Sequence, residues 1–182
     1  MSNEFRIESS THLLESHVFN VERRVVRHAE QTYERDVVVH PGGVAVLAID
    51  NEGRVGVIRQ WRSPFDAYLW EIPAGTQDVA HEVPLETAKR ELREELGVNA
   101  KQWRLLGRFM VSPGWTNQIM TIFEARDLTI TERAPEGPEE MTASIHWFSP
   151  EQLRDVLFEE PAIESTITIA LHRVFGTFFE QR

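Results

Sequence analysis

The sequence predicts an α+β fold, in which strands and helices pack as layers around a shared core. Short runs of apolar and β-branched residues recur along the chain and are typical of strands. A clear helical pattern at 84–96 lies between these runs, and two more follow the last of them. Strands with helices between and after them favour a sandwich of helices and sheet. The 182 residues suffice for one domain with a buried core.

Residues 1–40 are predicted to form a β extension of the main domain, which would cover 41–182. Strand-like pieces lie at 5–8 and 18–26, and the second partly alternates apolar and polar residues. This extension is short and polar, so it could hardly bury a core by itself. We expect it to lean on the main domain or on a second subunit.

The main domain is expected to begin with a hairpin. The run at 44–49 is wholly apolar and predicts a buried strand, and the turn at 50–53 leads into a second strand at 54–61. Residues 69–74 lead directly into Gly75. Later strands are predicted at 103–111, 118–125 and 143–148, and an acidic loop with two prolines is predicted at 131–141.

Cap residues and apolar spacing predict three helices. Pro84 suits the first position of the helix at 84–96, and Gly97 suits the residue just past its end. One face of that helix is apolar, through Leu85, Ala88, Leu92 and Leu96. Ser149 and Pro150 suit the start of a helix that runs to about residue 159. The last helix carries its apolar residues on one side, namely Ile163, Ile167, Leu171, Val174 and Phe178.

The helix at 84–96 also gathers carboxylates. Glu91 and Glu95 are four residues apart and share a face, with Glu94 beside them. Like charges at this spacing destabilise an isolated helix by roughly 0.2–0.5 kcal/mol per pair. Arg90, four residues before Glu94, relieves part of this repulsion. The cluster is therefore either a solvated, charge-laced surface or a site for a hard divalent cation such as Mg²⁺.

The spacing of the whole stretch resembles the Nudix box. That pattern is Gly, five residues, Glu, seven residues, then Arg-Glu-apolar-any-Glu-Glu-any-Gly-apolar. Gly75 matches its first Gly, Glu82 its isolated Glu, and 90–98 its final block. Six residues rather than five lie between Gly75 and Glu82. The extra residue falls in the loop before the helix, so it should leave the helical carboxylates in place.

The Nudix resemblance implies a mixed sheet between helices, that is, an α/β/α sandwich, and it favours the metal site. It implies Glu91 and Glu95 as the principal ligands of Mg²⁺, with Mn²⁺ as a possible substitute. Glu94 would be a third ligand or act in catalysis, and the backbone carbonyl of Ala74 would be a further ligand. Arg90 would orient the carboxylates of the box.

Flanking residues are similar to those of the ADP-ribose pyrophosphatase branch. They are the run 59–64 ahead of 71–75, the run 35–38, and Pro113, sixteen positions after Gly97. The resemblance implies hydrolysis of ADP-ribose to AMP and ribose 5-phosphate. It makes Arg35 and Arg62 candidate substrate contacts, with surface ion pairs as the alternative, and adds Pro113 and Gly114. Gln118 stands where the branch commonly has Glu, which removes a charge near the expected substrate pocket.

The general base in this branch usually comes from a late loop. Glu139 and Glu140 are the leading candidates here, ahead of Glu136, because they lie nearer the following strand. A solvated acidic loop is the alternative. Glu71 either approaches a metal or pairs with a neighbouring subunit.

Composition narrows the partners. The formal net charge of −10 argues against nucleic acid or an anionic membrane. The sequence has no cysteine, so thiolate chemistry and disulfides are excluded, and its histidines lack zinc-type spacing. We find neither a secretory signal nor an apolar run of roughly 18 residues, so a cytoplasmic location is expected.

Members of the branch are commonly homodimers with exchanged N-terminal segments, and we expect the same here. Two other functions stay open. One is hydrolysis of another nucleoside diphosphate sugar. The other is a Nudix-fold sensor without catalysis, although such proteins typically lose the box carboxylates, which are intact here.

Overall fold

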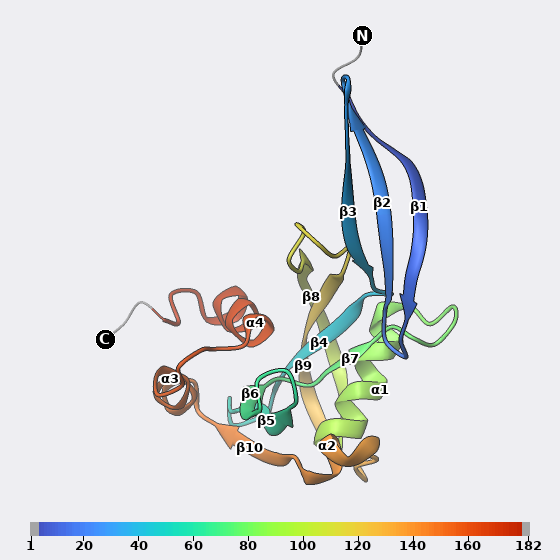
Figure 1. Ribbon diagram of the computed structural model, residues 1–182. Coiled ribbons are helices and arrows are strands. Elements are labelled where there is room, and N and C mark those ends of the chain that lie inside the picture. Colours follow the sequence, from blue (N-terminus) through green and yellow to red (C-terminus); the bar gives the residue numbers. More distant parts are fainter. Residues whose placement is uncertain (1–3, 180–182) are drawn as a thin grey trace. The chain divides into compact units, whose positions relative to one another are not determined.

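The computed structural model describes residues 4–179 and divides the chain into two units. The first unit comprises the chain up to Gly42 together with 109–120. The second comprises 43–108 and the chain from Thr121 onward. Figure 1 shows the elements of both units, and each unit is described separately below.

The first unit contains a three-stranded antiparallel sheet in the order β1-β2-β3. Its strands are β1 (Phe5–Glu15), β2 (Asn20–His28) and β3 (Gln31–Val39). The predicted piece at 5–8 falls within β1, which is longer, and the piece at 18–26 overlaps β2 but begins two residues before it. Most of β3 was not predicted. All of β1 is exposed, so its residues show no apolar face that a sequence pattern could reveal.

Charged pairs across the strands partly replace a core in this sheet. Arg23 stands directly opposite Asp36 and donates two hydrogen bonds to its carboxylate, at 2.7 and 2.9 Å. Arg27 pairs with Glu8 across the other interface. Exposed pairs of this kind contribute only about 0.2–1 kcal/mol each. The side chains of this sheet therefore contribute little to its free energy of folding.

The second unit contains a larger sheet in the order β10-β5-β4-β9-β8, with β6 beside β5 and β7 beside β4. Its strands are β4 (Gly43–Ile49), β5 (Val55–Arg62), β6 (Ala67–Glu71), β7 (Ala74–Thr76), β8 (Val98–Met110), β9 (Ile119–Ile130) and β10 (Ser144–Phe148). Its helices are α1 (Pro84–Leu96), α2 (Gly137–Thr142), α3 (Pro150–Phe158) and α4 (Ser165–Phe175). The ends of β8 and β9 within 109–120 belong to the first unit.

Strand β4 is buried along its whole length because helices cover both faces of the sheet. Val44 and Val46 cluster with Leu92 of α1. Helices α3 and α4 lie on the other side of the sheet from α1, as Figure 1 shows, and bury Leu153 and Leu171. The predicted α+β fold, an α/β/α sandwich, is confirmed. The hairpin of β4 and β5 is confirmed too, with Ile49 paired to Val55.

The helix caps follow the sequence closely. Helix α1 begins at Pro84, and Gly97 adopts the left-handed conformation at its end, with φ of 65°. Ser149 caps α3 through a reciprocal pair of hydrogen bonds with Gln152. The last helix is shorter than its apolar pattern, because Ile163 and Phe178 lie outside α4. Within 4–179, no helix combines the length and apolar character needed to cross a membrane.

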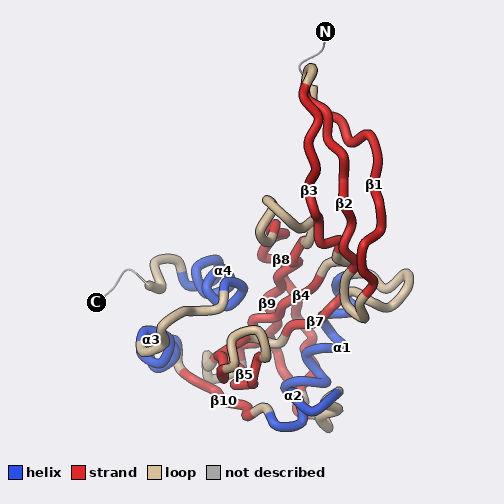
Figure 2. Tube along the Cα trace, in the orientation of Figure 1, coloured by secondary structure: helices blue, strands red, loops and turns tan. Residues whose placement is uncertain are grey.

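The prediction of a continuous loop at 131–141 was wrong, because part of it forms the short helix α2 (Figure 2). Pro138 lies in its first turn, where a missing backbone N–H costs nothing. Glu139 and Glu140 also lie in that turn, where negative charge is favourable.

Candidate active site

The carboxylates of α1 are buried against the strand that precedes the helix. Glu91, Glu94 and Glu95 expose only 6%, 7% and 2% of their surface. Acidic side chains are almost never buried to this extent unless they are paired or bind a cation. The interpretation of this face as a solvated surface is therefore wrong.

Two residues of β7 fit the carboxylates directly. The backbone N–H of Ala74 donates to Glu95 Oε2 at 2.8 Å. A Cβ atom on Gly75 would overlap the carboxyl group of Glu91, so only glycine leaves room for that group. Any side chain at the first glycine of the box would thus force the carboxyl of Glu91 to move.

Arg90 links the acidic residues around it. Its Nη1 lies 2.7 Å from Glu91 Oε1 and 2.9 Å from Glu94 Oε2. Its Nη2 lies 3.7 Å from Glu82 Oε2 and 3.8 Å from Asp78 Oδ1. The extra residue in the loop therefore leaves Glu82 beside the helix. One guanidinium holds the orientation of two buried carboxylates.

Burial makes the carboxyl groups of Glu91 and Glu95 hard to ionise. It raises the pKa of Glu91 to about 7, and the neighbouring charges of Glu94 and Glu140 add to this effect. Burial also raises the pKa of Glu95 well above its usual value, although the N–H of Ala74 opposes the rise. A bound cation would favour the charged forms of both groups.

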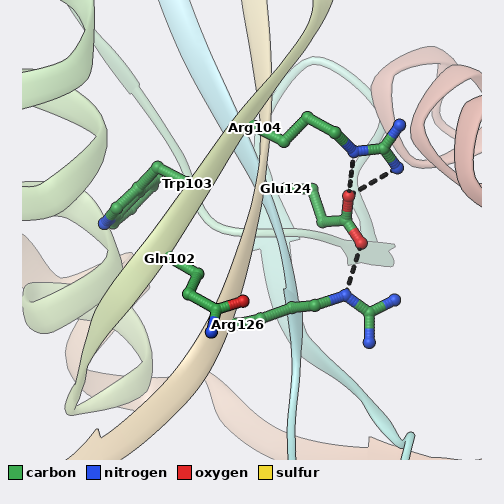
Figure 3. Close-up of a pocket in the computed structure, with 5 residues that line it drawn as sticks. All are labelled: Gln102, Trp103, Arg104, Glu124 and Arg126. Carbon is green, nitrogen blue, oxygen red and sulfur yellow. Dashed lines mark hydrogen bonds and ion pairs between the residues drawn. The ribbon is translucent and has the colours of Figure 1, made fainter.

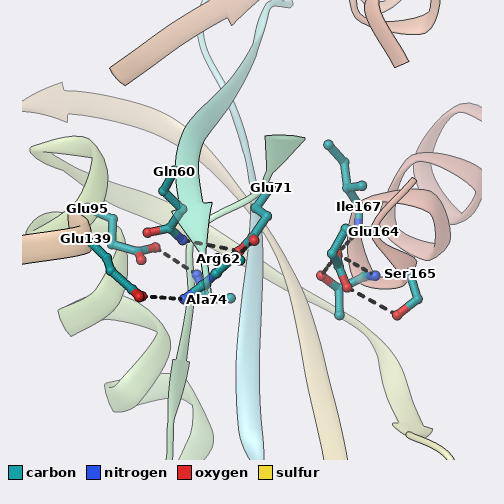
Figure 4. A network of polar contacts seen from close by, with 10 residues as sticks. Gln60, Arg62, Glu71, Ala74, Glu95, Glu139, Glu164, Ser165 and Ile167 are labelled. Atoms are coloured by element: carbon teal, nitrogen blue, oxygen red, sulfur yellow. Dashed lines mark hydrogen bonds and ion pairs between the residues drawn. The ribbon is translucent and has the colours of Figure 1, made fainter. Parts of the chain in front are cut away.

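A second charged cluster lies on β5 and β6 (Figure 4). Arg62 donates to both carboxylate oxygens of buried Glu71, at 2.8 and 2.7 Å. Gln60 donates to the same carboxylate at 3.2 Å. Glu71 therefore pairs within its own chain, and this pairing was not predicted. The bond to Glu71 raises the pKa of Arg62, so that guanidinium stays charged.

Helix α2 brings the candidate bases to the same site. Glu139 Oε2 lies 3.7 Å from Arg62 Nη1, an ion pair that Figure 4 also shows. The charge of Glu140 acts on Glu91 and Glu95, as their raised pKa values record. Glu140 Oε2 also accepts a hydrogen bond from the backbone N–H of Glu136. Glu136 itself lies just before α2 as its cap residue.

Arg133 was missed by the sequence analysis. Its Nε donates to the backbone carbonyl of Glu95 at 2.8 Å, and its Nη2 donates to that of Glu140 at 2.7 Å. Only its place at the start of an acidic segment could have drawn attention to it.

The donor set fits a hard divalent cation. Carboxylates are the ligands that Mg²⁺ prefers. The space beside Gly75 is filled by a carboxylate, and Glu82 Oε2 is buried without a hydrogen-bond partner in the described part of the chain. Among residues 4–179, however, no three acidic or histidine side chains stand in metal-binding geometry. In this structure Arg90 and the N–H of Ala74 engage the oxygens instead.

The remaining predicted site residues lie in the first unit. Arg35 stands on β3, where it donates to the carbonyl of Glu34 and lies 4.5 Å from the centre of the Tyr33 ring. Pro113 and Gly114 form the turn before Trp115, whose carbonyl accepts from the N–H of Val38 on β3. Their contact with substrate remains a prediction.

A cavity of about 280 Å³ on β8 and β9 is lined by none of the predicted site residues (Figure 3). Its buried Glu124 accepts hydrogen bonds from Arg104 at 2.5 Å and from Arg126 at 2.6 Å. These two bonds outweigh the effect of burial and lower the pKa of Glu124. Glu124 and the two arginines pair with one another, so we interpret this cluster as structural.

Known proteins resemble this chain over most of its length. The model of the NUDIX domain matches residues 39–168. An ADP-ribose pyrophosphatase of Mycobacterium tuberculosis (strain ATCC 25618 / H37Rv) is 36% identical over 81% of this chain and 73% of its own length. An ADP-ribose pyrophosphatase of Bacillus subtilis (strain 168) is 40% identical over 59% of this chain and 57% of its own length. A methanol dehydrogenase activator of Bacillus methanolicus is 33% identical over 78% of this chain and 76% of its own length.

A solved structure, that of an ADP compounds hydrolase, shares the fold with a TM-score of 0.78. The match covers 94% of this chain and 92% of that one, at 23% identity. The chain therefore belongs to the Nudix hydrolase family. Within the family, it falls in the branch that resembles ADP-ribose pyrophosphatases.

Proposed function

We propose that this chain hydrolyses the pyrophosphate bond of ADP-ribose, with Mg²⁺ as cofactor, to AMP and ribose 5-phosphate. The observation that carries the proposal is the buried carboxylate cluster of α1 in a chain whose relatives include two proteins named ADP-ribose pyrophosphatase. Water adds to one phosphorus and the bridging P–O bond breaks, so each product keeps one phosphate.

In this proposal Glu91 and Glu95 hold Mg²⁺, with Glu94 and the carbonyl of Ala74 as further ligands. When bound there, the cation would offset the charge of the substrate phosphates and lower the pKa of a bound water. Arg90 orients two of these carboxylates through bonds of 2.7 and 2.9 Å. Mn²⁺ should substitute for Mg²⁺, since it also accepts oxygen ligands.

The residues of α2 and β5 act on water and substrate. Glu140, or failing that Glu139, accepts the proton of the attacking water, and the proximity of α2 to the α1 carboxylates supports this. Arg62, which remains charged, contacts a phosphate or the terminal ribose. Arg35, Pro113 and Gly114 contact the substrate as the family resemblance implies.

We also propose a homodimer and a cytoplasmic location for this protein. The exposed β1 strand supports a homodimer in which the N-terminal segment 1–40 packs on a second copy, with 41–182 as the hydrolase domain. A cytoplasmic location stays a prediction of the sequence.

A second candidate is hydrolysis of another nucleoside diphosphate sugar. It is favoured by Gln118, which stands where the branch commonly has Glu. It is also favoured by the methanol dehydrogenase activator among the relatives, whose name gives an activity other than hydrolysis of ADP-ribose. A sensor without catalysis is less well supported, because every box carboxylate is present and the three on α1 are buried.

One experiment separates these functions. The purified protein is stripped of metal by chelation and then given Mg²⁺ with a panel of ADP-ribose, other nucleoside diphosphate sugars and nucleoside triphosphates. We expect AMP and ribose 5-phosphate from ADP-ribose only after Mg²⁺ is added. Full activity in the chelated sample would refute the metal role, faster turnover of another sugar would favour the second candidate, and binding without turnover would favour the sensor.

A further inference from the structure

The candidate site is built from two helices that carry acidic side chains. Glu91 and Glu95 lie on α1, and Glu139 and Glu140 lie on α2. No residue of α2 is buried, and Met141 on it is 66% exposed. Apolar packing therefore does little to hold α2 in place, and polar contacts must do so. Glu139 forms an ion pair with Arg62 of β5, but a link from α2 to α1 itself needs a further interaction.

Arg133 supplies that interaction through backbone atoms. Its Nε donates to the carbonyl of Glu95 at 2.8 Å and its Nη2 to the carbonyl of Glu140 at 2.7 Å. The carbonyl of Glu95 is one of the last four of α1, which lack intrahelical partners. A cation at this end is also favourable for the helix dipole. A single guanidinium thus joins the end of α1 to α2.

The backbone that carries Arg133 is itself fixed to α1. The N–H of Thr131 donates to the carbonyl of Gly97 at 2.8 Å. A Cβ on Gly97 would lie 3.2 Å from the carbonyl oxygen of Thr131 and 3.3 Å from the Cβ of Arg133. These close contacts fix the Cα of Arg133 beside the end of α1, and from there its Nη2 reaches the carbonyl of Glu140 on α2.

We propose that Arg133 is a positioning residue that sets the separation between the carboxylates of α1 and those of α2. Turnover then depends on Arg133, while binding of metal and substrate does not. This inference rests on the proposed function, because the proposed function assigns the general base to α2. It predicts that loss of the arginine misplaces Glu139 and Glu140 relative to water without removing any ligand.

The test compares Arg133→Ala and Arg133→Lys with Arg173→Ala. Arg173 is the matched control, because its Nε also donates to a backbone carbonyl, that of Leu106, at 2.9 Å, from α4. Three quantities are measured: kcat and KM for ADP-ribose, the affinity for Mn²⁺ by calorimetry, and amide hydrogen exchange at 137–143. Lysine keeps the charge but lacks the planar fork that reaches two carbonyls.

We expect kcat of Arg133→Ala to fall about tenfold or more, as a misplaced catalytic group would require. KM and the affinity for Mn²⁺ should stay within about twofold of wild type, exchange at 137–143 should accelerate, and Arg133→Lys should recover part of kcat. Arg173→Ala should change none of these. Unchanged kcat, or unchanged exchange at 137–143, in a folded Arg133→Lys or Arg133→Ala protein would overturn the inference.

The two proposals can fail separately. If wild type leaves ADP-ribose intact but cleaves another compound of the panel, the proposed substrate is wrong, and kcat on that compound tests Arg133. If wild type binds a compound of the panel but cleaves none, amide exchange still tests the link that Arg133 makes between α1 and α2. Unchanged exchange at 137–143 in Arg133→Ala would then overturn the inference, and faster exchange would support it.

Discussion

At the scale of single residues, the site depends on Gly75, which has no Cβ atom. The hydrogen of Gly75 leaves the space that the carboxyl of Glu91 occupies. We predict that Gly75→Ala displaces this carboxyl, lowers turnover by about two orders of magnitude, and weakens activation by Mg²⁺. The measurements are kcat and the Mg²⁺ activation constant at saturating substrate.

Gly56→Ala is the matched control for this change. A Cβ on Gly56 would lie 2.8 Å from Leu96 and from Trp147, in the core rather than beside a carboxylate. It should therefore lower the melting temperature but leave the Mg²⁺ activation constant of the folded protein unchanged. Equal activation constants in Gly75→Ala and wild type would contradict the role of Gly75.

Burial of Glu91 predicts a pH dependence of stability in the metal-free protein. The folded pKa of about 7 lies above the ordinary value of 4.5, so the protonated carboxyl favours the folded state. This contribution is present below pH 4.5 and is lost as pH rises through 7. Relative to wild type, Glu91→Gln should therefore gain about 2–3 kcal/mol between pH 5 and pH 8.

Urea unfolding of both proteins in chelator checks this prediction. Parallel pH profiles for wild type and Glu91→Gln would show that burial does not hinder ionisation of this carboxyl. Added Mg²⁺ should reduce the loss of stability in wild type at high pH, because it binds the ionised form.

At the scale of elements, the proposed base lies on α2 and the proposed metal ligands lie on α1. Glu140→Gln should lower kcat strongly and leave the Mg²⁺ activation constant almost unchanged, because a base acts on water and not on the cation. Glu95→Gln should lower kcat by two or more orders of magnitude, about 3 kcal/mol or more, and also weaken Mg²⁺ activation.

Glu139→Gln is the comparison within the same helix. If it is the more damaging change, the base is Glu139 and the mechanism stands. Harmless substitutions at Glu136, Glu139 and Glu140 alike would place the base outside this segment.

The cap of α3 gives a test of stability that does not involve the site. Ser149 accepts from the N–H of Gln152 at 3.2 Å, and its own N–H donates to the Gln152 side chain at 3.0 Å. Ser149→Ala should cost about 1 kcal/mol of unfolding free energy without changing kcat. Urea unfolding of Ser149→Ala, Gln152→Ala and the double variant measures this, and strict additivity would contradict the reciprocal cap.

Elements were predictable where the signal is local. Pro84 and Gly97 bound α1 and Ser149 starts α3, because caps act through neighbouring backbone. Strand β1 could be foreseen only in part, since its exposed residues depend on pairing with distant β2. Helix α2 was hidden by a Gly-Pro-Glu composition that is typical of loops.

The site was predictable to the same degree. The spacing of the box predicted the carboxylate cluster of α1, whereas the contacts of Arg62 with Glu139 and of Arg133 with Glu95 join segments far apart in the sequence. A hydrogen bond from Arg133 to the carbonyl of Glu95 spans 38 positions and leaves no periodic trace. Nor could the spacing explain why the first residue of the box is glycine.

At the scale of the whole molecule, we predict a homodimer. Strand β1 is an exposed edge that carries Phe5 and Ile7, at 66% and 59% exposure, and such edges pair readily with another chain. Sedimentation velocity at micromolar concentration should therefore give the mass of two chains. An active monomer under these conditions would remove the case for exchanged N-terminal segments.

The contact between Gly75 and Glu91 has a consequence for evolution. Every replacement of a glycine adds a Cβ, so no single substitution at this position spares the carboxylate. A lineage that loses the glycine first must therefore move the carboxyl of Glu91, and we expect it to pass through an impaired enzyme. When genomes are searched, a homologue with any other residue here is expected to hold this carboxyl differently, even if all its glutamates remain.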